Sequence, residues 1–128
     1  MQNKKYNVLL VDDEPYVLKA LSRSLRNFEV HRATGYDEAM TVIEEDAPLD
    51  AIVSDCAMPG PGGLVLLERA AAIRPETLRI LLSGNPPPEA SPLREREVIH
   101  RIVVKPWPAT FVEELQRSLD SRSSARPA

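Results

Sequence analysis

Residues 7–15 read Asn-Val-Leu-Leu-Val-Asp-Asp-Glu-Pro, a run of four apolar residues that ends at two adjacent aspartates. Three more apolar runs rich in β-branched residues follow, at 51–53, 80–82 and 102–104. Continuous hydrophobicity, in contrast to alternation, is typical of strands that are covered by helices on both faces. A weaker run at 29–33 predicts a fifth strand, at an edge of the sheet.

Helical periodicity fills the segments between these runs. Apolar residues recur at i, i+3 and i+4 spacing within 17–25, 39–43, 64–73 and 111–119. Alternation of strand and helix predicts right-handed βαβ crossovers and therefore a parallel sheet. We predict a five-stranded, doubly wound α/β fold.

Prolines mark several expected helix boundaries. Pro15 suits the first turn of a helix, and Pro108 precedes the last one. The stretch 85–92 contains four prolines and excludes a normal helix there. At best, Ser91 caps a short helix that begins at Pro92.

Composition bounds the class of protein. The 128 residues, 43% hydrophobic and 27% charged, predict one folded domain, and a net charge of −3 gives no electrostatic footprint for nucleic acid. No apolar run is long enough for a membrane span, and a single cysteine fits a reducing compartment, so we predict a cytoplasmic location. We expect the domain to cover 1–120, with 121–128 forming a disordered tail or the start of a linker.

Reactive side chains follow each of the four strong runs. Asp12 and Asp13 come after the first, Asp55 after the second, Ser83 after the third and Lys105 after the fourth. Each alone has a simpler interpretation, as a helix cap, a turn residue or a solvated charge. Because ligands of open parallel sheets bind at the carboxyl ends of the strands, their coincidence at one edge favours a site.

The residue types at this edge predict phosphoryl chemistry. Three neighbouring carboxylates repel one another unless a cation lies between them, and Mg²⁺ prefers such oxygen ligands. Asp55, on a central strand, is the best nucleophile for phosphorus and would form an acyl phosphate. Lys105, the Ser83 hydroxyl and backbone N–H groups would neutralise the oxygens of the phosphoryl group.

The segments NVLLVDDEP, VSDCAMPGPGGLVLL, ILLSG and VVKPW resemble the receiver domains of two-component response regulators, over nearly the whole chain. This resemblance implies the flavodoxin-like receiver fold with strand order 2-1-3-4-5 and a cis Lys105–Pro106 bond. It also implies Mg²⁺, with Mn²⁺ as a substitute, on Asp13, Asp55 and the carbonyl of Ala57, with Asp12 acting largely through water.

The resemblance further implies a role and partners. Asp55 would accept its phosphoryl group from a histidine kinase or a histidine phosphotransfer protein, and the domain would assist its own phosphorylation and dephosphorylation without being an enzyme for external substrates. A C-terminal output domain beyond residue 128 and a homodimer are compatible with the family.

Two departures from the family pattern concern signal output. Ile102 stands three residues before the lysine, where receivers usually carry an aromatic residue, and the fourth-helix region is crowded with prolines. Gly62 also stands where Asp or Asn is common. We therefore expect a short or irregular fourth helix, and a switch that works by ordering the loop 84–92.

Two alternative functions stay open at this point. A haloacid-dehalogenase-like phosphatase also uses an aspartate nucleophile with Mg²⁺, but its first strand carries an Asp-x-Asp motif, whereas this strand ends in Asp12-Asp13-Glu14. A phosphorylation-independent interaction module could also keep the fold.

Overall fold

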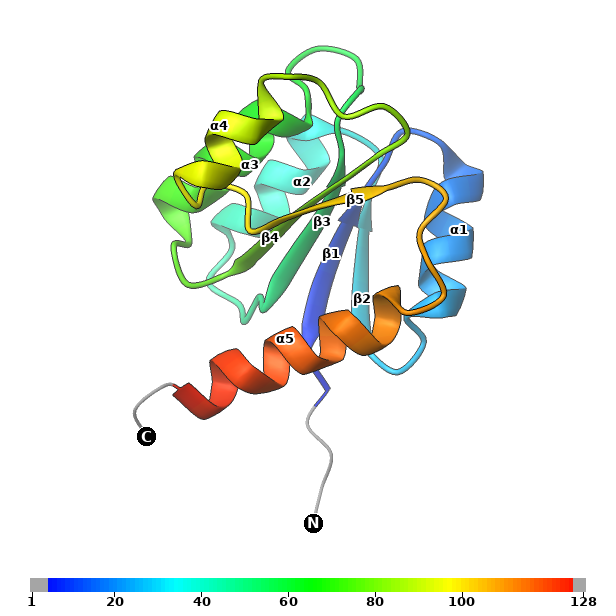
Figure 1. The fold of residues 1–128 in the computed structure, drawn as a ribbon, viewed down its shortest axis with the longest axis vertical. Coiled ribbons are helices and arrows are strands. Elements are labelled where there is room, and N and C mark those ends of the chain that lie inside the picture. Colours follow the sequence, from blue (N-terminus) through cyan, green and yellow to red (C-terminus); the bar gives the residue numbers. More distant parts are fainter. Residues whose placement is uncertain (1–4, 126–128) are drawn as a thin grey trace.

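The computed structural model describes residues 5–125, which contain a five-stranded sheet with all neighbouring strands parallel. The strands are β1 (Asn7–Val11), β2 (Glu29–Ala33), β3 (Ala51–Asp55), β4 (Leu78–Ser83) and β5 (Arg101–Val104). Their order, β2-β1-β3-β4-β5, confirms the predicted fold and places the weakest run, β2, at an edge (Figure 1).

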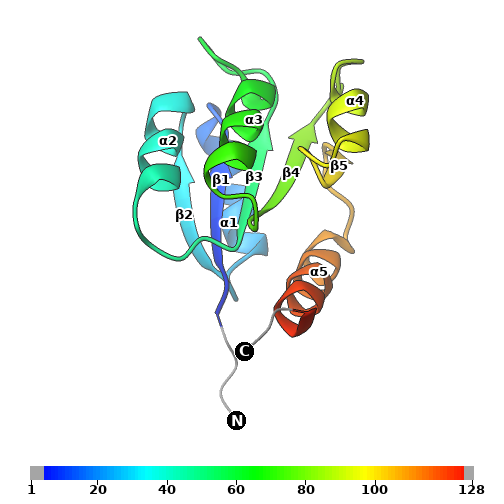
Figure 2. The same ribbon diagram turned by 90° about the vertical axis from the view of Figure 1, so that its left-hand side faces the viewer.

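Helices cover both faces of this sheet (Figure 2). In the described residues they are α1 (Pro15–Ser24), α2 (Tyr36–Glu44), α3 (Gly63–Ile73), α4 (Ala90–Glu95) and α5 (Phe111–Ala125). Apolar side chains of α1 and α5 form one core with the sheet, and those of α2, α3 and α4 form the other.

The interior strand β1 shows why its run is continuously apolar. Val8 and Leu10 belong to the core beneath α1 and α5, whereas Leu9 and Val11 belong to the opposite core. All four side chains are at most 1% exposed. Each position therefore gains the roughly 1.5–3 kcal/mol that burial of a large aliphatic side chain contributes.

Helix α4 is short, as predicted, but it begins at Ala90 and not at Pro92. The backbone N–H of Ala90 donates to the carbonyl of Pro87 at 3.0 Å, so the proline turn itself starts the helix. Pro92 is tolerated because first-turn N–H groups have no partner within a helix. The predicted cap at Ser91 is therefore wrong, since this residue lies inside the first turn.

Helix α5 continues to Ala125, so residues 121–125, for which a disordered tail or the start of a linker was expected, are helical, and residues 126–128 lie outside the described residues. Leu115 and Leu119 anchor the helix in the core, and each further residue adds a hydrogen bond to an existing helix. Arg122 also donates to the main-chain carbonyl of Glu76 at 2.6 Å. Polar composition alone did not reveal these two sources of stability.

Strand β4 begins two residues before its predicted run and includes Arg79, which is only 4% exposed. The guanidinium group of Arg79 is satisfied by main-chain carbonyls alone. Its hydrogen bonds of 2.7–3.3 Å reach the carbonyls of Arg74, Pro75, Thr77, Glu97 and Val98. This one side chain therefore joins the turn before β4 to the turn before β5.

Contacts also join the two ends of the described chain. The hydroxyl of Tyr6, just before β1, donates to Asp120 Oδ1 in α5 at 2.6 Å. Tyr6 is 5% exposed and belongs to the same core cluster as Leu115 and Leu119.

No helix in the described part of the chain has the length and apolarity that a membrane span requires.

Candidate functional site

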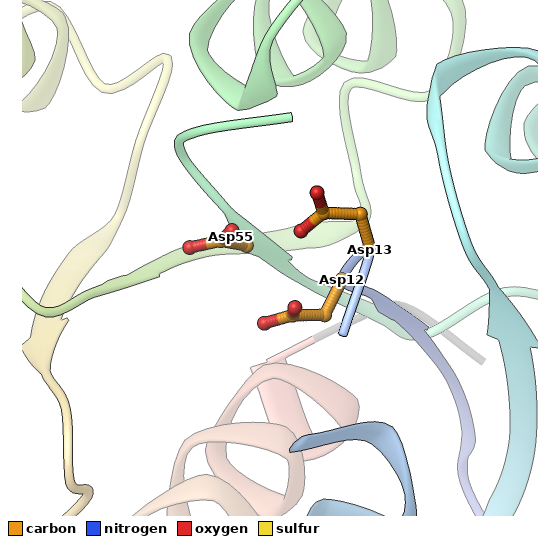
Figure 3. A group of neighbouring side chains, drawn as sticks. All are labelled: Asp12, Asp13 and Asp55. Carbon is orange, nitrogen blue, oxygen red and sulfur yellow. The ribbon is translucent and has the colours of Figure 1, made fainter. Parts of the chain in front are cut away.

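The carboxyl ends of the strands bring the predicted site residues to one edge of the sheet. Val11 pairs with Ser54, Asp55 with Leu82, and Ser83 with Val104, so neighbouring strands end at nearly the same level. Figure 3 shows Asp12 and Asp13 projecting after β1, close to Asp55 at the end of β3. A carboxylate oxygen from each of these three residues lies within 4.8 Å of the other two.

Lys105 forms ion pairs with two of these carboxylates. Its Nζ atom lies 2.8 Å from Asp12 Oδ2 and 3.1 Å from Asp55 Oδ1. The backbone of Lys105 is held in place as well, because its N–H donates to the Ser83 carbonyl at 2.9 Å. Its bond to Pro106 is cis, as the resemblance implied. The ammonium group is thus held between the strands that carry the acids.

Burial and charge act in opposite directions on these groups. Burial raises the pKa of the Asp55 carboxyl, the hydrogen bond from Lys105 opposes that shift, and the negative charge of Asp12 adds to it. For Lys105, burial disfavours the charged form, but the hydrogen bonds with Asp12 and Asp55 prevail and raise its pKa. Lys105 is therefore protonated at neutral pH.

The two acids after β1 differ in their surroundings. Asp12 is 1% exposed, and both its oxygens have partners: Oδ1 accepts from the backbone N–H of Glu14 at 2.9 Å and Oδ2 from Lys105. Asp13 is exposed. The geometry therefore leaves Asp13 and Asp55 more open to a cation than Asp12.

Ser83 completes the constellation. It is 6% exposed, and its Oγ accepts a 3.2 Å hydrogen bond from the backbone N–H of Asn85. One pocket brings together all the predicted site residues except Asp12, and three that were not predicted as site residues, Glu14, Gly84 and Asn85. Its lining residues are Asp13, Glu14, Asp55, Ala57, Ser83, Gly84, Asn85 and Lys105.

Glycine at the start of α3 allows close contact with the loop after Asp55. A Cβ atom on Gly63 would lie 1.9 Å from the carbonyl oxygen of Asp55, and one on Gly62 would lie 2.9 Å from that of Cys56. The N–H of Gly63 donates to the Cys56 carbonyl at 2.8 Å. The sequence offered only a Gly-Gly pair as a signal for this contact, and it was not identified as part of the site.

Chemically, the edge holds three carboxylates, one ammonium group and one hydroxyl around an open pocket. An octahedral Mg²⁺ ion needs ligand oxygens about 2.1 Å from its centre, hence neighbouring oxygens about 3–4 Å apart. The three carboxylates therefore fit a divalent cation after small side-chain movements.

Replacing Asp55 with Asn removes one of the crowded carboxylates. Because its pKa is raised in the folded state, ionised Asp55 lowers stability as the pH rises above its unfolded value. We expect Asp55→Asn to increase the free energy of unfolding at pH 7 in EDTA, measured by urea unfolding, because the variant carries no charge at this position.

The gain should shrink as the pH falls through the raised pKa of Asp55, because the wild-type carboxyl then becomes protonated, and Mg²⁺ should stabilise the wild type more than the variant. Asp46→Asn, at an exposed position, is the matched control. An equal gain in the control, or a gain that does not depend on pH, would contradict the role of crowding.

Comparisons with known proteins agree with this geometry. The family model described as "Response regulator receiver domain" matches residues 8–116. A curated relative, the hydrogenase transcriptional regulatory protein HoxA of Cupriavidus necator, is 30% identical over 125 residues. That match covers 95% of this chain but 26% of HoxA, so the chain spans about a quarter of this relative.

Solved structures show the same fold. The signal receiver domain of an HD domain-containing protein from Pseudomonas fluorescens Pf-5 is similar, with a TM-score of 0.86 and 26% identity, covering 94% of this chain and 99% of that one. A CheY-like receiver domain protein from Methanospirillum hungatei JF-1 has a TM-score of 0.88 at 24% identity, covering 96% and 100%. At that identity the second likeness concerns the fold alone.

Proposed function

The chain belongs to the response regulator receiver domain family, and from this membership we propose that it accepts a phosphoryl group on Asp55 in a Mg²⁺-dependent reaction. The proposed donor is the phosphohistidine of a histidine kinase or of a histidine phosphotransfer protein. A carboxylate oxygen of Asp55 forms the bond to phosphorus while the bond from phosphorus to the imidazole nitrogen breaks, giving an acyl phosphate.

One observation carries this proposal: Lys105 holds Asp55 and Asp12 together at the mouth of an open pocket. Phosphoryl transfer depends mainly on positioning and on neutralising charge around phosphorus. The Lys105 ammonium, already 3.1 Å from Asp55 Oδ1, is placed to pair with the oxygens of a phosphoryl group on that residue.

The proposed cation site consists of Asp13, Asp55 and the carbonyl of Ala57, with Asp12 contributing through water. The partners of Asp12 support this division, because its two oxygens already accept hydrogen bonds from Glu14 and Lys105. When bound, Mg²⁺ or Mn²⁺ would offset the negative charge of carboxylates and phosphoryl oxygens.

Ser83 is proposed to donate its hydroxyl proton to a phosphoryl oxygen. In the described residues its Oγ acts only as an acceptor, from Asn85, so its proton has no recorded partner. Its burial at the end of β4 keeps the hydroxyl beside the pocket.

Signal output is proposed to involve a further domain, because the chain spans only about a quarter of HoxA, a transcriptional regulatory protein by its name. Homodimerisation and a cytoplasmic location stay predictions.

Acetyl phosphate with Mg²⁺ should phosphorylate Asp55 without a protein donor, because the positioning groups lie in the chain itself. Intact-mass analysis should show a single phosphoryl adduct on the wild type, and none when EDTA is present from the start of the reaction. The same adduct on Asp55→Asn, or no adduct on the wild type, would refute the assignment. Continuous release of phosphate from simple esters without an adduct would instead indicate a phosphatase.

Lys105→Ala should affect signalling more than folding. In Mg²⁺ we expect the free energy of unfolding to change by no more than about 1 kcal/mol, as is usual for substitutions outside the core. Chemical-shift changes on adding beryllofluoride, a phosphoryl mimic, should be largely lost, because no ammonium pairs with the new charge. Lys19→Ala, exposed on α1, is the control and should respond as the wild type does.

The segment 84–92, a loop followed by the first turn of α4, should respond to the phosphoryl mimic more than β5 and α5 do. Ile102 is partly buried against the α2–α4 core and has no ring that could rotate, whereas the loop starts beside Ser83 and is mostly exposed. Hydrogen exchange with and without beryllofluoride should show added protection in this loop. Large changes at Ile102 and α5 with an unchanged loop would show that the signal instead passes through β5 and α5.

A further inference from the structure

A second pocket lies at the amino-terminal ends of the strands, whereas Asp55 lies at the carboxyl ends. It is formed by the starts of β4 and β5 and the C-terminal half of α5. Apart from Leu78, its lining consists of basic and hydroxyl side chains and includes no acidic one: His100, Arg101, Arg117, Ser118, Ser121 and Arg122. We call it the β4–α5 pocket. The proposed phosphoryl transfer uses none of these residues.

The tautomer of His100 is fixed by the sheet. The backbone N–H of Arg79 donates to His100 Nδ1 at 2.9 Å, so the neutral imidazole carries its proton on Nε2. Burial, followed by the positive charges of Arg79 and Arg122, lowers the pKa of His100 to about 4 and keeps it neutral. His100 therefore contributes a hydrogen-bond donor to the pocket, and Nε2 has no recorded partner in the described residues.

The surroundings of the pocket are positively charged. Arg79, directly behind His100, is buried and donates only to main-chain carbonyls, so no carboxylate in the described residues forms an ion pair with it. The negative charge of Glu76, in the exposed turn before β4, favours the charged form of Arg79. Burial has the larger effect and lowers the pKa of Arg79. A buried charge without a paired counter-charge is unfavourable, and a bound anion would stabilise it.

The guanidinium groups that line the pocket are engaged to different degrees. Arg101 pairs with Glu114 at 2.6 Å, and Arg122 donates to the Glu76 carbonyl. Arg117 is exposed on α5 and has no recorded hydrogen bond or ion pair within residues 5–125. Its charge acts on Glu114, but no hydrogen bond or ion pair of Arg117 would have to break for it to bind a ligand.

We propose that the β4–α5 pocket binds an oxyanion of the phosphate class. The donors are the Nε2–H group of His100, the guanidinium groups of Arg117 and Arg122, and the hydroxyls of Ser118 and Ser121. Charge-assisted hydrogen bonds from guanidinium groups are the usual means by which proteins hold phosphate. A phosphate group on an organic ligand and free phosphate share this chemistry.

The test uses the two histidines of the chain, of which His31 lies exposed on β2 and serves as an internal control. Nitrogen and carbon resonances of both rings are followed while inorganic phosphate or adenosine 5′-monophosphate is added in EDTA. His100 should shift and saturate in the millimolar range or below, whereas His31 should not. Tighter binding of the nucleotide would assign the phosphate to an organic ligand, and equal binding would assign it to the free anion.

Arg117→Gln should weaken the binding about tenfold or more, since a hydrogen bond to a charged group is lost. Arg69→Gln, with the same charge change at an exposed position on α3, should leave it unchanged. An unmoved His100, or equal weakening by both variants, would overturn the proposal. Because EDTA removes the divalent cation and Asp55 is not involved, the result is independent of the phosphorylation experiment.

Discussion

The ion pairs of Lys105 with Asp12 and Asp55 are the interaction on which the functional edge of the molecule depends. Without a cation, two buried carboxylates at this distance would repel each other and favour protonation. Lys105 offsets part of that repulsion and leaves Asp13 uncompensated. The edge therefore keeps a negative charge that favours a divalent cation, while its nucleophile stays ionisable.

The sheet makes this arrangement possible because its strands end at one level. The side chains of β3 are buried along the whole strand, so the position of Asp55 is set by packing on two faces and not by the loop that follows. Gly63 adds a further constraint, since only a residue without Cβ lets α3 approach the Asp55 carbonyl so closely. The packed strands thus hold site residues from distant parts of the sequence close together at one end of the sheet.

Much of the fold and the site could be predicted from sequence, because buried parallel strands are continuously apolar and ligand sites lie at their carboxyl ends. Continuous apolar runs identified β1 and β3, and the polar residues that follow them identified the site. What escaped prediction depends on contacts that are distant along the chain. The predicted run 80–82 left out Arg79, a charged residue that the structure places inside β4, where carbonyls from two separate turns satisfy its guanidinium group. The approach of Gly63 and the extension of α5 to Ala125 have the same kind of cause.

The hydrogen bond between Tyr6 and Asp120 has a consequence for the order in which the molecule can form. The strands β2, β1 and β3 are neighbours in the sheet and also come first in the chain, so this part can assemble through relatively short loop closures. Helix α5 covers the strand that was laid down first, and its contact with Tyr6 spans 114 positions. Folding from the N-terminus therefore leaves the core on this face of β1, which α1 and α5 share, incomplete until nearly the whole chain is available.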